Sequence, residues 1–431
     1  MNLFKQLPLF RRNKLALFFW IILALSIWLR FYNLSNFAGF AWDQEQLLAY
    51  PVKNIITNHK LYLIGPETGP GGIHLGPLIY YLAVPFFWAF KLHPIAGSVL
   101  ASTLGIFTGL LFYLVLTPFF KSRLGLIGYA IYAVSPLINF NDRTIWNPSL
   151  IPLASLGVLI AQLNWWRYRR LTRLNLGLLA TSMALGVQAH LGFIFTLPVA
   201  IFSLIYLRLL SKLNFGKCAW FVGILLVWFS PLIIFDLRHQ GVNLNSLLKF
   251  LDTGSVNFNL VTHLTKSLRV LQSLIQMLGG LAAQFRFFKL EAILGSAVIV
   301  SAWIFRRHLN SQLVNLFLIW LITYALGFSF YQGNIPEYYL WPMLLPGLLI
   351  ISLLLNSLLL HFKVALPVFL AMLIMFLMFQ TLELISTTAP DSLQHKLQTV
   401  QHIIAKSQGQ HFRVVYDTDF GRNAVFSYRD C

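Results

Sequence analysis

The stretch PLIYYLAVPFFWAF, Pro77 to Phe90, decides how often the chain crosses a membrane and in which direction. It is shorter than the roughly 20 residues that a helical span requires. If it crossed, starting from an N-terminus inside, the basic stretches KSR at Lys121 and WWRYRRLTR at Trp165 would both lie outside. If it lies at the membrane interface, every short basic cluster falls on the inner side, as the positive-inside rule requires. We therefore predict that it does not cross. The inner clusters are then Arg11, Arg12 and Lys14, Lys121 and Arg123, Arg167, Arg169, Arg170 and Arg173, Arg208, Lys212 and Lys217, Arg306 and Arg307, and Lys363.

The composition of the chain indicates that lipid is its solvent. Of its 431 residues, 58% are hydrophobic and 10% are charged, and the mean hydropathy is +0.71. Soluble domains carry roughly 25% charged residues. We predict an all-α polytopic protein of the plasma (cytoplasmic) membrane with about eleven transmembrane helices, its N-terminus inside and its C-terminus outside. The predicted spans are 15–34, 95–117, 124–139, 149–166, 174–189, 191–208, 218–236, 288–305, 313–331, 338–358 and 364–384.

The charge and the cysteines exclude several other classes of protein. The net charge is +19, but the Lys and Arg residues lie between apolar runs, as in cytoplasmic loops, so we expect no nucleic-acid partner. The first apolar run has a basic front and no small-residue cleavage site, which indicates a retained helix rather than a signal peptide. Cys218 and Cys431 form no CxxC motif, and the predicted topology puts them on opposite sides of the membrane.

The stretch FAWDQEQLLAY, Phe40 to Tyr50, places two acids just beyond the first predicted span. Asp43 is the candidate general base, with a helix-capping box formed with Gln46 as the alternative. Glu45 points to a different side of a helix and is the second candidate catalytic acid, or else a solvated surface charge. The apolar positions that follow predict an amphipathic helix on the outer membrane surface, kinked or broken at Pro51. These positions are Leu47, Leu48, Pro51, Val52, Ile55 and Ile56.

Two other outer segments supply candidate substrate-binding side chains. In LIGPETGPGGIHLGPLIYY these are His74, Tyr80 and Tyr81. The alternatives are a histidine that satisfies its loop and tyrosines that anchor an aromatic belt. In YQGNIPEYYLWP the candidates are Glu337 and Tyr338.

A third outer loop, NFNDRTIWNPSLIP, contains Asp142, Arg143 and Asn147. Charged groups near membrane depth usually face a cavity, and Arg can hold a phosphate with two parallel hydrogen bonds. We therefore assign Arg143 to the donor phosphate and Asp142 and Asn147 to the substrate; the alternative is an Arg–Asp pair that closes the turn. The long segment 237–287 adds Lys266 and Arg269, which are either further phosphate ligands or ordinary surface charges.

The motifs FAWDQEQ, LIGPET, HLGPLIYYL, NDRTIWNPS and PEYYLWP, in this order, resemble the GT-C membrane glycosyltransferases. The resemblance is to the protein O-mannosyltransferase-like and lipid A aminoarabinose transferase-like group. It implies a multi-pass catalytic domain over 1–385, with two helices in the first outer loop, the second at the interface. It also implies transfer of a sugar from a polyprenyl-phosphate donor to a lipid, glycan or protein acceptor outside, with Asp43 as base. The family commonly has two adjacent acids, whereas Gln44 separates Asp43 from Glu45 here. Residues 386–431 form a short extracytoplasmic tail with two strand-like stretches, 412–420 and 423–430.

The chemistry that we expect is a single displacement that inverts the anomeric centre, because no second carboxylate in paired geometry is evident. Asp43, Glu45 and Asp142 could supply oxygen ligands for Mg²⁺ or Mn²⁺. We nevertheless expect a metal-independent reaction without a cofactor. A polymerase or ligase of surface glycans is one alternative. A transporter or flippase for lipid-linked glycans is less favoured, because the predicted spans are almost free of charge.

Overall fold

The computed structural model describes residues 14–68, 71–253, 260–282, 288–331, 333, 335–362, 364–386, 392–408 and 410. Within these ranges the regular structure is helical, with isolated β-bridges between Gly39 and Ser392 and between Glu67 and His74. The predicted all-α fold is thus confirmed. The strand-like stretches 412–420 and 423–430, together with Lys363 and Cys431, lie outside the described residues.

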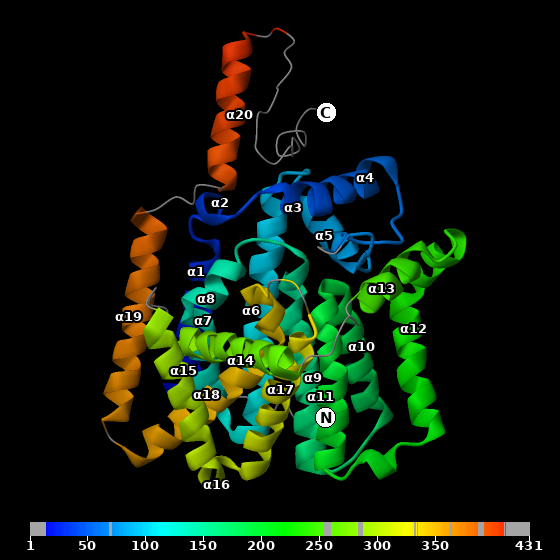
Figure 1. Ribbon diagram of the computed structural model, residues 1–431. Helices are drawn as coiled ribbons and strands as arrows, with labels where there is room; N and C mark the ends of the chain where they lie inside the picture. The colour runs from blue at the N-terminus through cyan, green and yellow to red at the C-terminus, as the bar shows by residue number, and fades with distance from the viewer. Residues whose placement is uncertain are drawn as a thin grey trace.

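Figure 1 shows the helices in their order along the chain. The first half contains α1 (Lys14–Phe31), α2 (Leu34–Phe37), α3 (Trp42–Gln44), η3 (Glu45–Ala49), α4 (Tyr50–Asn58), α5 (Leu78–Ala89), α6 (Ile95–Phe120), α7 (Ser122–Val134), α8 (Pro136–Asn141), η4 (Asn147–Leu150), α9 (Ile151–Tyr168), α10 (Arg173–Ala189), η5 (Leu191–Phe195) and α11 (Thr196–Tyr206). The second half contains η6 (Leu210–Lys212), α12 (Phe215–Arg238), α13 (Val242–Thr253), α14 (Leu260–Ala282), α15 (Phe288–Ile304), α16 (Arg306–Leu309), α17 (Ser311–Ser329), η7 (Glu337–Met343), α18 (Leu344–His361), α19 (Ala365–Ser386) and α20 (Leu393–Ser407).

Six helical stretches of the described chain are long and apolar enough to cross a membrane: Ile95–Phe120, Asn147–Tyr168, Phe215–Arg238, Ser311–Ser329, Glu337–His361 and Ala365–Ser386. The helix α12 is apolar and yet has no residue buried inside the protein. A helix that is hydrophobic on all sides needs an apolar surrounding, which here is lipid. The chain is therefore a multi-pass membrane protein.

The other predicted spans correspond to shorter helices, so the number of eleven spans stays a prediction. Proline accounts for the length of one of these short helices. The helix α7 ends at Val134, and α8 begins at Pro136, whose nitrogen carries no hydrogen to continue the helical ladder.

The helix α5 does not traverse the bundle, as predicted for Pro77–Phe90. Gly76, just before α5, lies against Gln188 near the end of α10; a Cβ on Gly76 would come within 2.1 Å of the Gln188 side-chain oxygen. Phe87, near the end of α5, lies beside Gly97 in the first turn of α6. The neighbours at both ends of α5 thus belong to the same end of the bundle. This end, which carries α3, α4 and α5, is called the α4 end below (Figure 1).

The basic turns gather at the opposite end of the bundle, called the basic end below. Arg169 donates to the carbonyl of Leu207, Lys212 donates to the carbonyl of Arg169, and Lys217 donates to the carbonyl of Lys212. The helix α16, with Arg306 and Arg307, lies at this end too (Figure 1). This distribution agrees with the charge pattern that the sequence analysis used.

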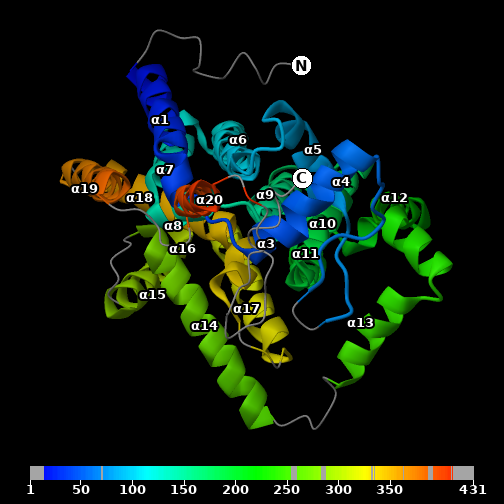
Figure 2. The same cartoon turned by 90° about the horizontal axis from the view of Figure 1, so that it is seen from above.

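The amphipathic helix α14 runs across the bundle rather than along it (Figure 1). It crosses α15 at two glycines: a Cβ on Gly279 would lie 1.9 Å from the Glu291 carbonyl oxygen, and one on Gly295 would lie 1.8 Å from that of Ile275. Without side chains at these positions the two backbones touch. Seen from above, α13 and α14 extend to either side of α17 (Figure 2).

Candidate functional site

The helix predicted after the first span is continuous from Trp42 to Asn58, but its middle turn, η3, is a π-helical turn. The backbone N–H of Tyr50 donates to the carbonyl of Glu45, five residues back. Pro51 follows at once and has no N–H to restore the α-helical ladder. The predicted irregularity at Pro51 is thus a widened turn rather than a break. Such turns occur frequently at functional sites.

Asp43 lies within the first turn of this helix and its side chain is exposed. The capping role belongs to another residue, since the backbone N–H of Ala41 donates to Oε1 of Gln44 over 2.9 Å. This is the contact that the third residue of a helix makes in a capping box. The predicted box between Asp43 and Gln46 is therefore wrong, because the helix begins two residues earlier.

Glu45 is fully buried, with 0% of its surface exposed. Its interpretation as a solvated surface charge is therefore wrong. The expected divergence of the two acids is observed, since Asp43 is exposed and Glu45 faces the interior. Side chains two positions apart along a helix point to nearly opposite sides.

Asp43 lies at the edge of a cluster of rings from four separate segments, called the aromatic cluster below. Its carboxylate interacts electrostatically with the phenol of Tyr338 in η7. The ring of Tyr338 lies 4.8 Å from that of Trp146 and 5.6 Å from that of His190. Tyr339 packs on His190 at 4.1 Å. The aromatic cluster consists of Trp146, His190, Tyr331, Tyr338 and Tyr339.

His190, which the sequence analysis did not identify, sits at the turn between α10 and η5. Its Nδ1 accepts a hydrogen bond from the backbone N–H of Gly192 over 3.0 Å. Burial lowers the pKa of His190 from 6.5 to about 4. The ring is therefore neutral at neutral pH, and its proton is on Nε2 because Nδ1 is an acceptor. The sequence offered one signal for His190, which is a single polar ring at the end of a long apolar run.

A lysine approaches the other edge of the aromatic cluster. The hydroxyl oxygens of Tyr331 and Tyr339 lie 3.4 Å apart, and Nζ of Lys266 lies 3.4 Å from the carbonyl oxygen of Tyr331. Arg269 is exposed one turn further along α14. The structure thus brings Asp43, Tyr338 and Lys266 to one region of the α4 end. Their functional roles stay predictions.

The predicted acid Glu337 precedes Tyr338 in η7, and its carboxylate is repelled by that of Glu291 at the start of α15. Asn147 begins η4 directly after Trp146. Both residues are therefore next to the aromatic cluster in sequence, and their substrate-binding roles stay predictions.

Asp142 and Arg143 do not pair with each other, so the alternative of an Arg–Asp pair within the turn is wrong. Asp142 accepts from Nε of Arg30, a fully buried residue of α1, over 2.8 Å. Arg143 is buried and donates to the carbonyl oxygens of Leu29 (3.1 Å) and Tyr32. Both of its terminal nitrogens thus bind the end of α1. This placement argues against a role for Arg143 in holding phosphate.

The three candidates in the first loop have structural contacts. The backbone N–H of His74 donates to Asn243 over 2.6 Å, and its Nδ1 lies 3.3 Å from the carbonyl oxygen of Gly65. The Tyr81 hydroxyl donates to the carbonyl of Tyr62 over 2.8 Å. Tyr80 is 4% exposed and packs edge-on against Tyr62. A substrate role for these residues stays a prediction that their contacts do not favour.

Among the described residues, no three His, Cys, Asp or Glu side chains are grouped as metal ligands. The predicted set of Asp43, Glu45 and Asp142 is not assembled, because Asp43 is exposed at the aromatic cluster, Glu45 is buried, and Asp142 binds Arg30.

No family model and no curated protein matches the chain. Its fold is similar to that of ArnT from Cupriavidus metallidurans bound to undecaprenyl phosphate, with a TM-score of 0.56 and 13% identity. The apo structure of the same protein matches with a TM-score of 0.53 and 13% identity. Each match covers 79% of this chain, which spans 60% and 59% of those structures. The oligosaccharyltransferase of Archaeoglobus fulgidus in complex with zinc and sulfate matches more weakly, with a TM-score of 0.48 and 16% identity. This match covers 93% of this chain and 59% of that one. The chain therefore has the fold of the GT-C membrane glycosyltransferases, as the motif resemblance predicted.

Proposed function

We propose that this protein is a membrane glycosyltransferase that moves a sugar from a polyprenyl-phosphate donor to a hydroxyl of a lipid, glycan or protein acceptor. One observation supports it above all. The exposed carboxylate of Asp43 and the ammonium group of Lys266 lie at two edges of one aromatic cluster, at one end of the bundle. Transfer from a lipid phosphate needs a base for the acceptor and a cation for the leaving group, and these residues supply both.

The proposed reaction is one displacement. The acceptor oxygen forms a bond to the anomeric carbon of the sugar while the bond from that carbon to the phosphate oxygen breaks. The bonding electrons leave with the phosphate, whose charge Lys266 and Arg269 stabilise. Asp43 takes the proton of the acceptor hydroxyl. Because the acceptor attacks opposite the leaving phosphate, the anomeric centre is inverted.

The aromatic cluster fits a sugar-binding role in this proposal. Ring faces pack against the apolar side of a sugar, and the Tyr338 and Tyr339 hydroxyls offer hydrogen bonds to its polar edge. The likeness to ArnT, whose structure holds undecaprenyl phosphate, supports a donor of the same chemical class. We propose that the α4 end faces outside, since the basic residues gather at the opposite end.

The test is consumption of radiolabelled polyprenyl-phosphate sugars by membranes that contain the protein. We expect wild type to consume one of them and Asp43→Asn to turn it over at least a hundredfold more slowly, as loss of a general base implies. Glu67→Gln, an exposed acid in the same loop, is the matched control and keeps its activity. A fully active Asp43→Asn variant would refute the assignment of the base, and the absence of any consumption by wild type would refute the transferase.

The same assay separates the alternatives. A polymerase or ligase would consume a donor that carries an extended glycan in preference to a single sugar. A flippase would move the donor across the membrane without breaking its bond to phosphate. We propose a metal-independent reaction; inactivation by a chelator that Mg²⁺ or Mn²⁺ reverses would contradict it.

A further inference from the structure

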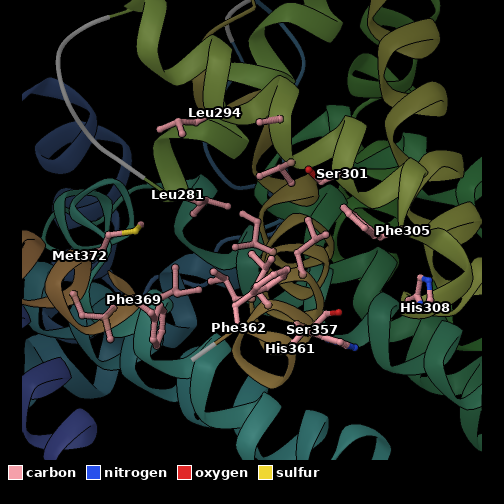
Figure 3. Close-up of a pocket in the computed structure, with 18 of the residues that line it drawn as sticks. Leu281, Leu294, Ser301, Phe305, His308, Ser357, His361, Phe362, Phe369 and Met372 are labelled. Carbon is pink, nitrogen blue, oxygen red and sulfur yellow. Dashed lines mark hydrogen bonds between the residues drawn. The ribbon is translucent and has the colours of Figure 1, made fainter. Parts of the chain in front are cut away.

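A cavity of about 400 Å³ opens between α15, α18 and α19, away from the residues of the aromatic cluster. Its walls are apolar, with Leu294 and Val298 on α15, Leu355 on α18, and Phe369, Met372 and Phe376 on α19. Figure 3 shows several of these side chains around the opening. This cavity is called the α19 groove below. Apolar walls make dispersion contacts with an apolar occupant, which favours such an occupant here.

The length of the α19 groove matches one leaflet of a bilayer. On the α15 side its lining extends from Leu294 to Phe305. Eleven residue steps at 1.5 Å each give about 16 Å. The hydrocarbon core of a bilayer is roughly 30 Å thick, so the groove covers about half of it. An acyl chain that belongs to a single leaflet fits this length.

The lining becomes polar at the end of the groove near Phe305. Ser301, His308, Ser357 and His361 line this part (Figure 3). Large apolar side chains remain exposed beside them, with Leu358 42% exposed and Phe362 57% exposed. The mouth of the groove is therefore both apolar and polar, as the boundary between lipid tails and head groups requires.

Cationic residues are close in sequence to the residues that line this mouth. Arg306 and Arg307 lie between Phe305 and His308 in the chain, and the Arg306 guanidinium lies over the Trp303 ring at 4.8 Å. Trp303 is 54% exposed. Exposed tryptophan beside arginine is typical of the membrane–water interface, which sets the level of the mouth. Arg123 is also near, since it donates to the carbonyl of Leu359 over 3.2 Å.

We propose that the α19 groove binds one anionic glycerophospholipid, with an acyl chain along α15, α18 and α19 and its phosphate among Arg306, Arg307, His308 and His361. The apolar walls select a lipid tail, and the cationic mouth selects a negative head group. The mouth is at the basic end, opposite the end with Asp43. A sugar donor whose phosphate reacts beside Asp43 would have its head group at the other end, so this lipid is not the donor.

Filling the α19 groove tests the proposal. The full-length protein is reconstituted in vesicles of phosphatidylglycerol and phosphatidylcholine in equal amounts and extracted into mild detergent. Native mass spectrometry then measures the lipid retained per chain. Ala297 lines the groove, so Ala297→Phe narrows it. Val300→Phe, on the same helix at a 54% exposed position outside the lining, is the matched control.

We expect wild type and Val300→Phe to retain one phosphatidylglycerol, and Ala297→Phe to retain at least fivefold less. Met372→Trp, from α19, is a second filling variant, which guards against misfolding of the first. Unchanged retention in a folded filling variant would overturn the proposal.

Removing the cations tests the head-group contact. Arg306→Gln combined with Arg307→Gln should abolish the preference for phosphatidylglycerol over phosphatidylcholine, whereas Arg208→Gln, at another basic turn, should preserve it. Equal retention of both lipids by wild type would overturn the assignment of an anionic lipid. Displacement of phosphatidylglycerol by added polyprenyl phosphate in wild type would assign the groove to the donor tail instead.

Discussion

Gln44 joins the helix that carries Asp43 to the loop that carries Trp146, because its Nε2 donates to the carbonyl oxygen of Ile145 over 3.0 Å. The other end of the same amide accepts from the N–H of Ala41. The side chain is 6% exposed, and its two fixed partners are in segments far apart in the chain. The position of Asp43 relative to the aromatic cluster therefore depends on one buried amide.

Replacing Gln44 by Ala should lower turnover more than it changes the KM for the donor. The substitution leaves the Ala41 N–H and the Ile145 carbonyl without their partner, at a cost of roughly 1–3 kcal/mol. A small displacement of a catalytic group is enough to slow the reaction. Steady-state kinetics of Gln44→Ala, with Asn58→Ala on the exposed side of α4 as control, measure the effect. A loss of stability with unchanged kcat would leave Gln44 with a structural role alone.

Breaking the buried pair between Arg30 and Asp142 should destabilise the protein strongly. Asp142→Asn leaves the guanidinium of Arg30 buried without its counter-charge, and such changes cost about 3–5 kcal/mol. Removing both charges with Arg30→Met and Asp142→Asn should cost less than Asp142→Asn alone. Thermal unfolding of the detergent-solubilised variants is the measurement. A normally stable Asp142→Asn variant with a raised acceptor KM would instead support the predicted substrate role.

Replacing Lys266 by Gln should reduce kcat/KM for the lipid-phosphate donor about tenfold or more. A hydrogen bond to a charged group contributes roughly 1.5–3 kcal/mol, and the neutral amide no longer opposes the charge of the departing phosphate. Lys249→Gln, at an exposed position on α13, is the control for a general loss of positive charge. Equal effects of the two substitutions would indicate long-range attraction of the donor rather than contact with Lys266.

Acidification should destabilise the protein through His190. Its pKa is about 4 in the folded protein and close to 6.5 when unfolded, so the unfolded chain binds the extra proton between these values. The contribution of the neutral His190 ring to the free energy of unfolding is therefore fully present above pH 6.5 and decreases as the pH drops towards 4. The loss at pH 5 is about 2 kcal/mol. His190→Gln should show a smaller difference in unfolding temperature between pH 8 and pH 5; an identical difference would mean that His190 does not contribute.

The turn at Arg167–Arg173 should face the cytoplasm. A cysteine at Arg170, in a chain with Cys218→Ser and Cys431→Ser, should react with membrane-permeant thiol reagents and resist impermeant ones added outside. A cysteine at Leu61, which is 75% exposed at the α4 end, should react with both. The reverse pattern would invert the topology and place the aromatic cluster inside.

Periodicity, charge and turn chemistry predicted much of the helical framework. The position of α5 at one end of the bundle agrees with the prediction from its length and from the basic clusters on either side of it in the chain, because both arguments depend only on local sequence; its place at the membrane interface stays a prediction. The shortness of α7 was harder to predict, since Pro136 fits both the end of one helix and the first turn of the next.

The site was predicted less completely, because its contacts join remote parts of the chain. The alternative that Asp142 pairs with its neighbour Arg143 was wrong, because its partner is Arg30, 112 residues away. Glu45 seemed exposed because a charged side chain on an amphipathic helix usually is, and its burial depends on what covers that face. His190 gave no local pattern beyond a polar ring at the end of a span.

The π-helical turn over Glu45–Ala49 adds a residue to the helix without turning its two ends relative to each other. Each residue of an α-helix advances by about 100°, and a π-helical turn holds one residue more than an α-helical turn. Deleting one residue within this turn would restore the regular helix and leave the side chains of Val52 and Ile55 in the same orientation relative to Asp43. Val52 is fully buried. A chain one residue shorter here would therefore keep both the apolar face of α4 and the carboxylate of Asp43 in place, and would lose only the widened turn.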